Sequence, residues 1–103
     1  MFFGKEFFVY IIQSNSGKNY IGQTNNLQDR LIRHNSNRSN YTKNKGPWKL
    51  VISTKINSRS EAVTLETKLK KMKNSKKAIS YLEKLNFNIK NDGLSSVGLE
   101  HPD

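Results

Sequence analysis

The sequence has no cysteine and only two histidines among its 103 residues. Without cysteine, the protein can form no disulfide bond, use no thiol in catalysis and hold no zinc ion through thiolates. Two histidines also argue against a metal centre built from imidazole ligands alone. Because disulfides are rare in reducing compartments, the absence of cysteine agrees with a cytoplasmic protein.

Long apolar runs are missing as well. No stretch approaches the roughly 18 consecutive apolar residues of a membrane-spanning helix. The opening MFFGKEFFVY is interrupted by Gly4, Lys5 and Glu6 and has no small-residue cleavage site, which argues against a signal peptide. We expect one domain over residues 1–86 and a disordered tail over residues 87–103, where no hydrophobic period is sustained.

Acidic residues are scarce. Eighteen Lys and Arg residues oppose eight Asp and Glu residues, which gives a formal net charge of +10. Three of the eight acids lie in the last twelve residues, so the preceding domain is more basic still. A field of this sign on a small protein favours a polyanionic partner, either nucleic acid or an anionic membrane surface. The alternative is a basic surface that only keeps the protein soluble.

Local residue patterns predict three strands and three helices. β-branched and aromatic residues indicate strands at 7–13, 19–23 and 48–56, the first two joined as a hairpin by the turn residues SNSGK. Three helices are expected. The first covers about 26–36, the second begins at a capping box formed by Ser58 and Glu61 and ends at about residue 73, and the third covers 76–86. The order ββαβαα predicts an α/β (α+β) fold, a small three-stranded sheet with helices packed on it.

Two charged side chains of the first helix lean toward its buried side. Helical spacing puts Arg30 and His34 one turn apart, beside the apolar stripe of Leu27 and Leu31. Arg30 is either a snorkelling side chain that covers apolar surface or a guanidinium held rigidly for a phosphate. A lone histidine at a helix edge is more often structural than functional.

Glu66 stands out among the few acids. Helical spacing puts it beside the stripe of Leu65, Leu69 and Met72, where a carboxylate needs a partner, a metal or a hydrogen-bond network. The other four acids of residues 1–85 have local explanations. Glu6 precedes the first strand, Asp29 lies in the first turn of a helix, Glu61 belongs to the capping box, and Glu83 lies on a polar helix face. A metal at Glu66 would have one protein carboxylate and several waters, an arrangement that Mg²⁺ accepts.

The hairpin carries two tyrosines and a glycine. Tyr10 and Tyr20 either pack across the strands as aromatic neighbours or form a joint site. Gly22 has no side chain, so another backbone or a ligand can approach it closely. For the tyrosines to share one face, paired residue numbers must have an even sum, and the hairpin loop must hold an odd number of residues or carry a bulge.

Six lysines crowd residues 68–77, KLKKMKNSKK. They are Lys68, Lys70, Lys71, Lys73, Lys76 and Lys77. The run is either a solvated helix face or a surface that contacts the phosphate backbone of nucleic acid without reading its sequence. The second interpretation is favoured because the run begins two residues after Glu66.

These motifs together resemble the GIY-YIG nuclease superfamily. The resemblance rests on FVY at 8–10, YIG at 20–22, Arg30, His34 and a glutamate in the next helix, and it covers roughly residues 5–85. The pair Tyr41–Thr42 is similar to the small stand-alone bacterial members, which the chain resembles most. The wider family often has a functional asparagine after the glutamate, for which Asn74 and Asn86 are the candidates.

The resemblance implies a metal-dependent endonuclease that uses one divalent ion, Mg²⁺ or Mn²⁺. It implies that Glu66 binds the metal, that Arg30 steadies the scissile phosphate, and that Tyr20 or Tyr10 takes a proton from the attacking water. His34 and Tyr41 occupy supporting positions. A free tyrosine has a pKa of about 10 and is a poor base, but a nearby arginine and metal favour the phenolate.

The expected partner is nucleic acid, with DNA as the expected substrate. A larger repair or recombination complex is expected as a further partner, and no interaction with a membrane is expected. The alternative is a non-catalytic nucleic-acid-binding module on the same fold. A more distant reading is a small basic interaction subunit of a nucleic-acid complex.

Overall fold

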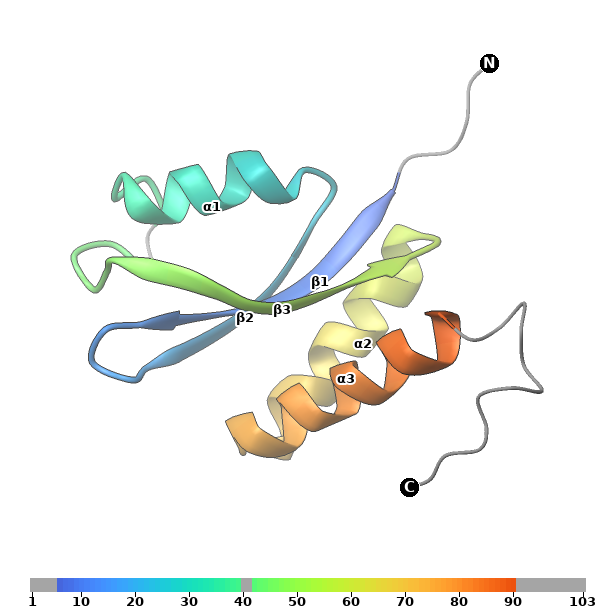
Figure 1. Cartoon of the computed structure of the whole chain (residues 1–103). Helices are drawn as coiled ribbons and strands as arrows, with labels where there is room; N and C mark the ends of the chain where they lie inside the picture. Colours follow the sequence, from blue (N-terminus) through green and yellow to red (C-terminus); the bar gives the residue numbers. More distant parts are fainter. Residues whose placement is uncertain (1–5, 40–41, 91–103) are drawn as a thin grey trace, which may run out of the picture.

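The chain forms six elements in the order β1 (Phe7–Ser14), β2 (Asn19–Thr24), α1 (Leu27–Asn35), β3 (Trp48–Ile56), α2 (Arg59–Met72) and α3 (Ser75–Lys90). The computed structural model describes residues 6–39 and 42–90. The three strands make one antiparallel sheet in the order β2-β1-β3, with β1 at the centre (Figure 1). The predicted α+β fold and its ββαβαα order are therefore confirmed.

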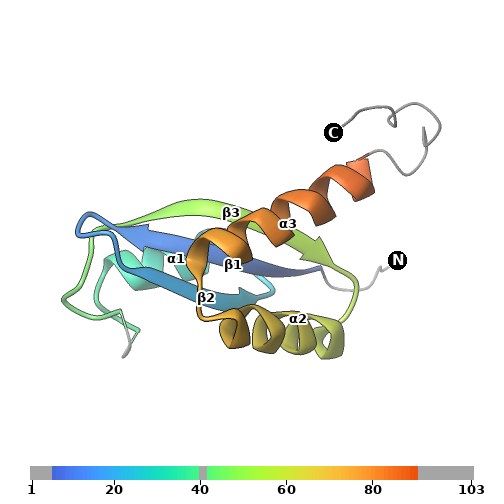
Figure 2. The ribbon, with the colours of Figure 1, turned by 90° about the horizontal axis from the view of Figure 1, so that it is seen from below.

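The sheet has helices on both faces. Successive residues of β1 point to opposite sides, so its unbroken apolar run fills two cores. Tyr10 and Ile12 pack with Trp48 on the side of α1, whereas Val9 and Ile11 pack on the side of α2 and α3. Figure 2, seen from below, shows α2 and α3 in front of the sheet and α1 behind it.

The β1–β2 hairpin turns through a three-residue loop, Asn15 to Gly17. The backbone N–H of Ser14 donates to the carbonyl of Lys18 at 2.9 Å, and Gly17 adopts φ = 91°, a left-handed conformation that glycine tolerates. In the resulting register Tyr10 pairs with Gly22, and Ile12 pairs with Tyr20. The paired residue numbers have even sums, so the predicted odd-length loop is confirmed and both tyrosines lie on the α1 face.

The capping residues explain where α2 begins and ends. The Ser58 hydroxyl accepts a hydrogen bond from the backbone N–H of Glu61 at 3.2 Å, as the sequence predicted. Lys73 closes α2 in a left-handed conformation with φ = 50°. Asn74 then caps α3, because its side-chain oxygen accepts from the backbone N–H of Lys77 at 3.0 Å.

The third helix is longer than the sequence predicted. It continues to Lys90, four residues beyond the expected end at 86. The reason is a tertiary contact of Asn86, whose amide donates to the Ser53 carbonyl at 3.0 Å and whose oxygen accepts from the Thr54 hydroxyl at 2.5 Å. This anchor on β3 offsets the poor helix propensity of asparagine. Of the predicted tail, residues 91–103 lie outside the described residues.

No helix in the described part of the chain combines the length and apolar character needed to cross a membrane.

Candidate active site

Tyr10 and Gly22 meet across the centre of the hairpin. A Cβ atom added at Gly22 would lie 2.6 Å from the Tyr10 hydroxyl oxygen and 2.8 Å from the ring carbon that carries it. Any side chain there would therefore displace the phenol. The sequence predicted close approach by a backbone or a ligand, but the group that approaches is the Tyr10 side chain.

Three rings gather between the hairpin and α1. The ring centroids of Tyr10 and Tyr20 are 6.3 Å apart, and His34 lies 5.9 Å from Tyr10 and 5.0 Å from Tyr20. The Tyr10 hydroxyl and His34 Nε2 are hydrogen-bonded at 2.9 Å. Tyr10 and His34 are both buried, while Tyr20 is half-buried. The structure thus brings together three of the residues that the sequence singled out.

Thr42 holds the far side of the histidine ring. Its hydroxyl lies 2.7 Å from His34 Nδ1, and its carbonyl accepts a hydrogen bond from Trp48 Nε1 at 3.2 Å. The Asn35 side chain clamps the backbone of Trp48, accepting from its N–H at 2.7 Å and donating to its carbonyl at 3.0 Å. Sequence reasoning noted Thr42 only as the companion of Tyr41, which lies outside the described residues.

Charges from two helices act on the Tyr10 phenol. Burial raises the pKa of Tyr10 and its neighbour Tyr20 raises it further, whereas Arg30 lowers it through its charge and a side-chain hydrogen bond. The negative charge of Glu66 raises the pKa of Tyr10 in turn. Arg30 on α1 therefore contacts the phenol directly, whereas Glu66 on α2 acts on it through its charge alone.

Burial also shifts the pKa of His34. It lowers this pKa, and the nearby charge of Arg30 lowers it further. At neutral pH the ring is therefore neutral and carries a single proton.

Glu66 has a cationic partner on its own helix. Its carboxylate lies 2.7 Å from the Lys70 ammonium, and its side chain is 18% exposed. A cavity of about 450 Å³ lies beside this pair, lined by Asn19, Tyr20, Ile21 and Lys70. The described residues contain no group of three or more His, Asp or Glu side chains that could hold a metal ion, and Glu66 adjoins the cavity through Lys70.

The two asparagines proposed from the sequence are engaged away from the tyrosines. Asn74 caps α3, and Asn86 is bound to Ser53 and Thr54 of β3. Thr54 pairs with Val9 and is buried on the face covered by α2 and α3. The structure therefore gives both asparagines structural contacts and brings neither to the ring cluster.

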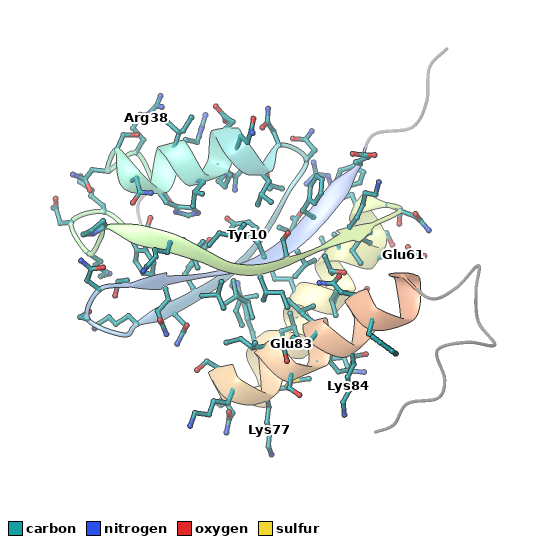
Figure 3. The ribbon with its side chains drawn as sticks, in the orientation of Figure 1. Tyr10, Arg38, Glu61, Lys77, Glu83 and Lys84 are labelled. Carbon is teal, nitrogen blue, oxygen red and sulfur yellow. The ribbon has the colours of Figure 1, made fainter. Side chains whose placement is uncertain are left out.

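The six lysines of residues 68–77 are all exposed. They follow the second half of α2, its junction with α3 and the first turn of α3, and only Lys70 lines the cavity. Lys68 lies over the Tyr81 ring, 5.0 Å from its centroid. Figure 3 shows Lys77 at the start of α3, pointing away from the sheet.

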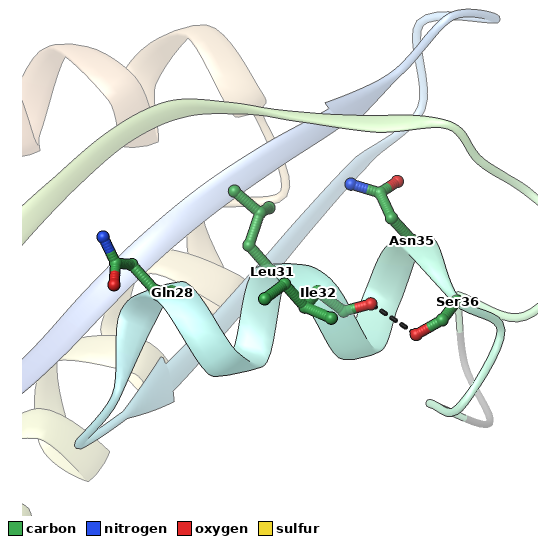
Figure 4. Close-up of a pocket in the computed structure, with 5 residues that line it drawn as sticks. All are labelled: Gln28, Leu31, Ile32, Asn35 and Ser36. Carbon is green, nitrogen blue, oxygen red and sulfur yellow. Dashed lines mark hydrogen bonds between the residues drawn. The ribbon is translucent and has the colours of Figure 1, made fainter.

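A groove of about 590 Å³ runs along the outside of α1, lined by Gln28, Leu31, Ile32, Asn35 and Ser36 (Figure 4). Its floor is mainly apolar, and Ile32 is 59% exposed. Among the described residues, none of the candidate tyrosine, arginine, histidine or glutamate side chains lines it. Tyr20 and Lys70 instead line the smaller cavity.

Comparison with known proteins gives a consistent result. A family model described as the GIY-YIG catalytic domain matches residues 6–79. A UPF0213 protein of Streptococcus pneumoniae is 34% identical over 71 residues, which cover 68% of this chain and 72% of that protein. The UPF0213 protein OB0043 of Oceanobacillus iheyensis is 32% identical over 69 residues, or 66% and 80% of the two chains. The solution NMR structure of the UPF0213 protein BH0048 from Bacillus halodurans is 26% identical, covers 94% of this chain and 99% of that one, and gives a TM-score of 0.46.

Proposed function

Because the chain belongs to the GIY-YIG family, we propose that it is an endonuclease that hydrolyses phosphodiester bonds of nucleic acid, with DNA as the substrate. One observation carries the proposal. Tyr10, Tyr20 and His34 form one cluster between the hairpin and α1, and Arg30 of α1 is hydrogen-bonded to the Tyr10 phenol. Together with the carboxylate of Glu66, whose charge acts on the same phenol, these are groups that can bind a phosphate and a metal and move a proton.

A single divalent cation, Mg²⁺ or Mn²⁺, fits Glu66. The carboxylate is a hard oxygen donor beside a cavity large enough for the waters that such an ion retains. Its present partner, Lys70, has a 53% exposed side chain and can move into solvent. When bound, the cation would supply Lewis-acid stabilisation of the charge that develops on the leaving oxygen.

The remaining catalytic roles fall to Tyr20, Arg30 and His34. Tyr20 lines the cavity and is more exposed than Tyr10, which supports Tyr20 as the group that takes the proton of the attacking water. Arg30 would hold the scissile phosphate through its guanidinium fork. His34 supports both tyrosines, through its hydrogen bond to Tyr10 and its edge contact with Tyr20. A supporting role for Tyr41 rests on the resemblance alone.

The lysines of residues 68–77 would contact the phosphate backbone on either side of the bond that is cut. Their exposure and the chain's net charge of +10 support this role. A place in the cytoplasm within a larger DNA-repair or recombination complex is part of the same proposal and rests on the resemblance alone.

The competing proposal is a non-catalytic nucleic-acid-binding module. The ion pair between Glu66 and Lys70 favours it, because the carboxylate already has a partner without a metal. The test is incubation with supercoiled plasmid, branched DNA and RNA, each with Mg²⁺, Mn²⁺ or a chelator. Cleavage that requires the metal and disappears in Glu66→Gln supports the nuclease, whereas binding without cleavage under every condition supports the module.

A further inference from the structure

The two ends of the sheet differ in charge. One end, here called the hairpin end, is where β1 turns into β2 and Ser14 pairs with Trp48, the first residue of β3. At the opposite end β2 leads into α1, and β3 leads into α2. Three of the five acids of residues 6–90 lie near that opposite end, before β1 and in the first turns of α1 and α2: Glu6, Asp29 and Glu61.

Basic side chains collect at the hairpin end. Residues 30–60 contain eight Lys and Arg residues and no acid. The hairpin, the loop before β3 and the start of β3 carry five exposed basic residues, here called the loop group: Lys18, Arg38, Lys43, Lys45 and Lys49. Figure 3 shows Arg38 and Glu61 at opposite ends of the sheet.

The loop that carries part of this group is fixed beside the tyrosines. The Thr42 hydroxyl lies 2.7 Å from His34 Nδ1, and the Thr42 carbonyl accepts from Trp48 Nε1 at 3.2 Å. The Asn37 side chain accepts from the backbone N–H of Asn44 at 3.0 Å. The described part of the loop therefore holds its cations at a defined place next to the ring cluster.

The lysines of residues 68–77, the lysine run, reach the hairpin end from the other face of the sheet. Lys70 lines one cavity with Tyr20 and with Asn19, the first residue of β2. The junction of α2 and α3 lies at the same end as the hairpin loop (Figure 1). Tyr20 therefore lies between two basic groups, with Lys70 on one side and the loop bonded to its neighbour His34 on the other.

The side chains at this end favour a double-stranded partner. Proteins that bind single strands stack the bases on aromatic side chains. Of the aromatic residues described here, Tyr20 is half-buried and Trp48 is buried, and the exposed Phe87 follows Asn86, which is anchored to β3 away from the hairpin. Two separate groups of cations suit the two phosphate backbones of a duplex.

We propose that the hairpin end is a binding surface for double-stranded nucleic acid, with the lysine run on one phosphate backbone and the loop group on the other. The bond to be cut then lies between the two groups, at Tyr20. The inference rests on the proposed function and adds to it the form of nucleic acid that the site accepts and a second contact surface.

The test is fluorescence anisotropy of the full chain with a short blunt-ended DNA duplex and with each of its separated strands, in chelator so that nothing is cut. Wild type should bind the duplex about tenfold more tightly than either strand, because a single strand engages one group of cations. The double variant Lys43→Ala with Lys49→Ala should flatten the slope of log affinity against log salt for the duplex by up to about two. Equal affinity for the duplex and its strands would overturn the proposal.

Lys55→Ala with Lys84→Ala is the matched control. Both lysines are exposed, and both lie toward the opposite end, Lys55 in an ion pair with Glu6 and Lys84 two residues before Asn86. This double variant removes the same charge and should leave the slope unchanged. An equal loss in both double variants would mean that net charge alone governs binding, which would overturn the proposed surface. Should the first double variant fail to fold, Lys18→Ala with Arg38→Ala tests the same group.

Two further outcomes separate this surface from its alternatives. Binding of wild type to anionic phospholipid vesicles, with no binding to the duplex, would overturn the proposal in favour of a membrane surface. A wild type that binds the duplex with the expected slopes and never cleaves it would defeat the nuclease and leave the surface in place. A wild type that cleaves the duplex while Lys43→Ala with Lys49→Ala keeps the full slope would defeat the surface and leave the nuclease in place.

Discussion

The Glu66 carboxylate lies 2.7 Å from the Lys70 ammonium, one helical turn further along α2. The proposed metal ligand is thus neutralised by a cation of its own helix. A divalent ion that binds Glu66 has to displace Lys70, so the two cations compete for one carboxylate.

This competition predicts that Lys70→Met binds Mn²⁺ more tightly than wild type. Exposed pairs at this spacing are worth a few tenths of a kcal/mol, so the expected gain is about twofold. Lys71→Met is the matched control, since it removes the same charge from the same helix without touching Glu66. Titration of Mn²⁺ by electron paramagnetic resonance measures the affinities. Equal affinities for the two variants would contradict the competition.

Tyr20→Phe and Tyr10→Phe should differ in what they damage. Each removes one hydroxyl, but the Tyr10 hydroxyl is buried and bound to His34, whereas Tyr20 lines the cavity. Tyr20→Phe should lose about a hundredfold or more in cleavage rate and keep its stability. Tyr10→Phe should also lose about 1 kcal/mol of unfolding free energy. Plasmid cleavage and urea denaturation measure the two effects, and a Tyr20→Phe variant with wild-type cleavage would remove Tyr20 from the chemistry.

Gly22→Ala should destabilise the protein. The new Cβ would lie 2.6 Å from the Tyr10 hydroxyl oxygen, so the phenol must shift and its bond to His34 must lengthen. Overpacking of this kind costs about 1–3 kcal/mol. Combining the change with Tyr10→Phe removes the closest atom and should recover part of the loss, because contacting sites are not additive. If the double variant loses the sum of the unfolding free energies that the two single variants lose, the Tyr10 hydroxyl is not the cause of the strain.

Acidification should weaken the fold through His34. Burial and Arg30 lower the pKa of His34 in the folded state below its ordinary value of about 6.5. The unfolded chain therefore binds more protons as pH falls, and stability falls with it. The contribution is complete above about pH 6.5 and is lost as pH drops toward and through the folded pKa. Urea denaturation between pH 8 and 5 should show this loss in wild type and a shallower slope in His34→Gln.

Nucleic-acid affinity should fall steeply as salt rises. Each lysine that neutralises a phosphate contributes about 0.9 to the slope of log affinity against log salt. Lys71, Lys73 and Lys76 are exposed and stand outside the ion pair with Glu66, so changing all three to alanine should flatten the slope by up to about three. Fluorescence anisotropy over a range of salt concentrations measures it. An unchanged slope would mean that this face is only solvated.

Contacts that depend on the periodicity of helices and strands and on the pairing of strands could be predicted from the sequence. The alternation of β1 and the need for an even register placed Tyr10 and Tyr20 on one face, and the helical spacing of Arg30 and His34 turned both toward the sheet. The pair of Glu66 and Lys70 has an equally regular spacing and was open to the same reasoning.

Contacts that depend on loop paths could not be predicted. The hydrogen bond between Thr42 and His34 joins residues eight positions apart, and no local pattern encodes it. The sequence predicts a helix that ends at Asn86, but the Asn86 side chain is hydrogen-bonded to Thr54 of β3, 32 residues earlier in the sequence. Such long-range hydrogen bonds override local propensity.

Tyr10 belongs to β1, the central strand of the sheet, and this has a consequence for protein engineering. Its phenol is at once part of the apolar packing under α1 and part of the proposed catalytic machinery. The site therefore cannot be transplanted as a loop onto another scaffold, since its innermost group comes with the sheet that surrounds it. Efforts to raise thermal stability are better directed at the contact between α3 and β3, which contains neither Tyr10 nor Glu66.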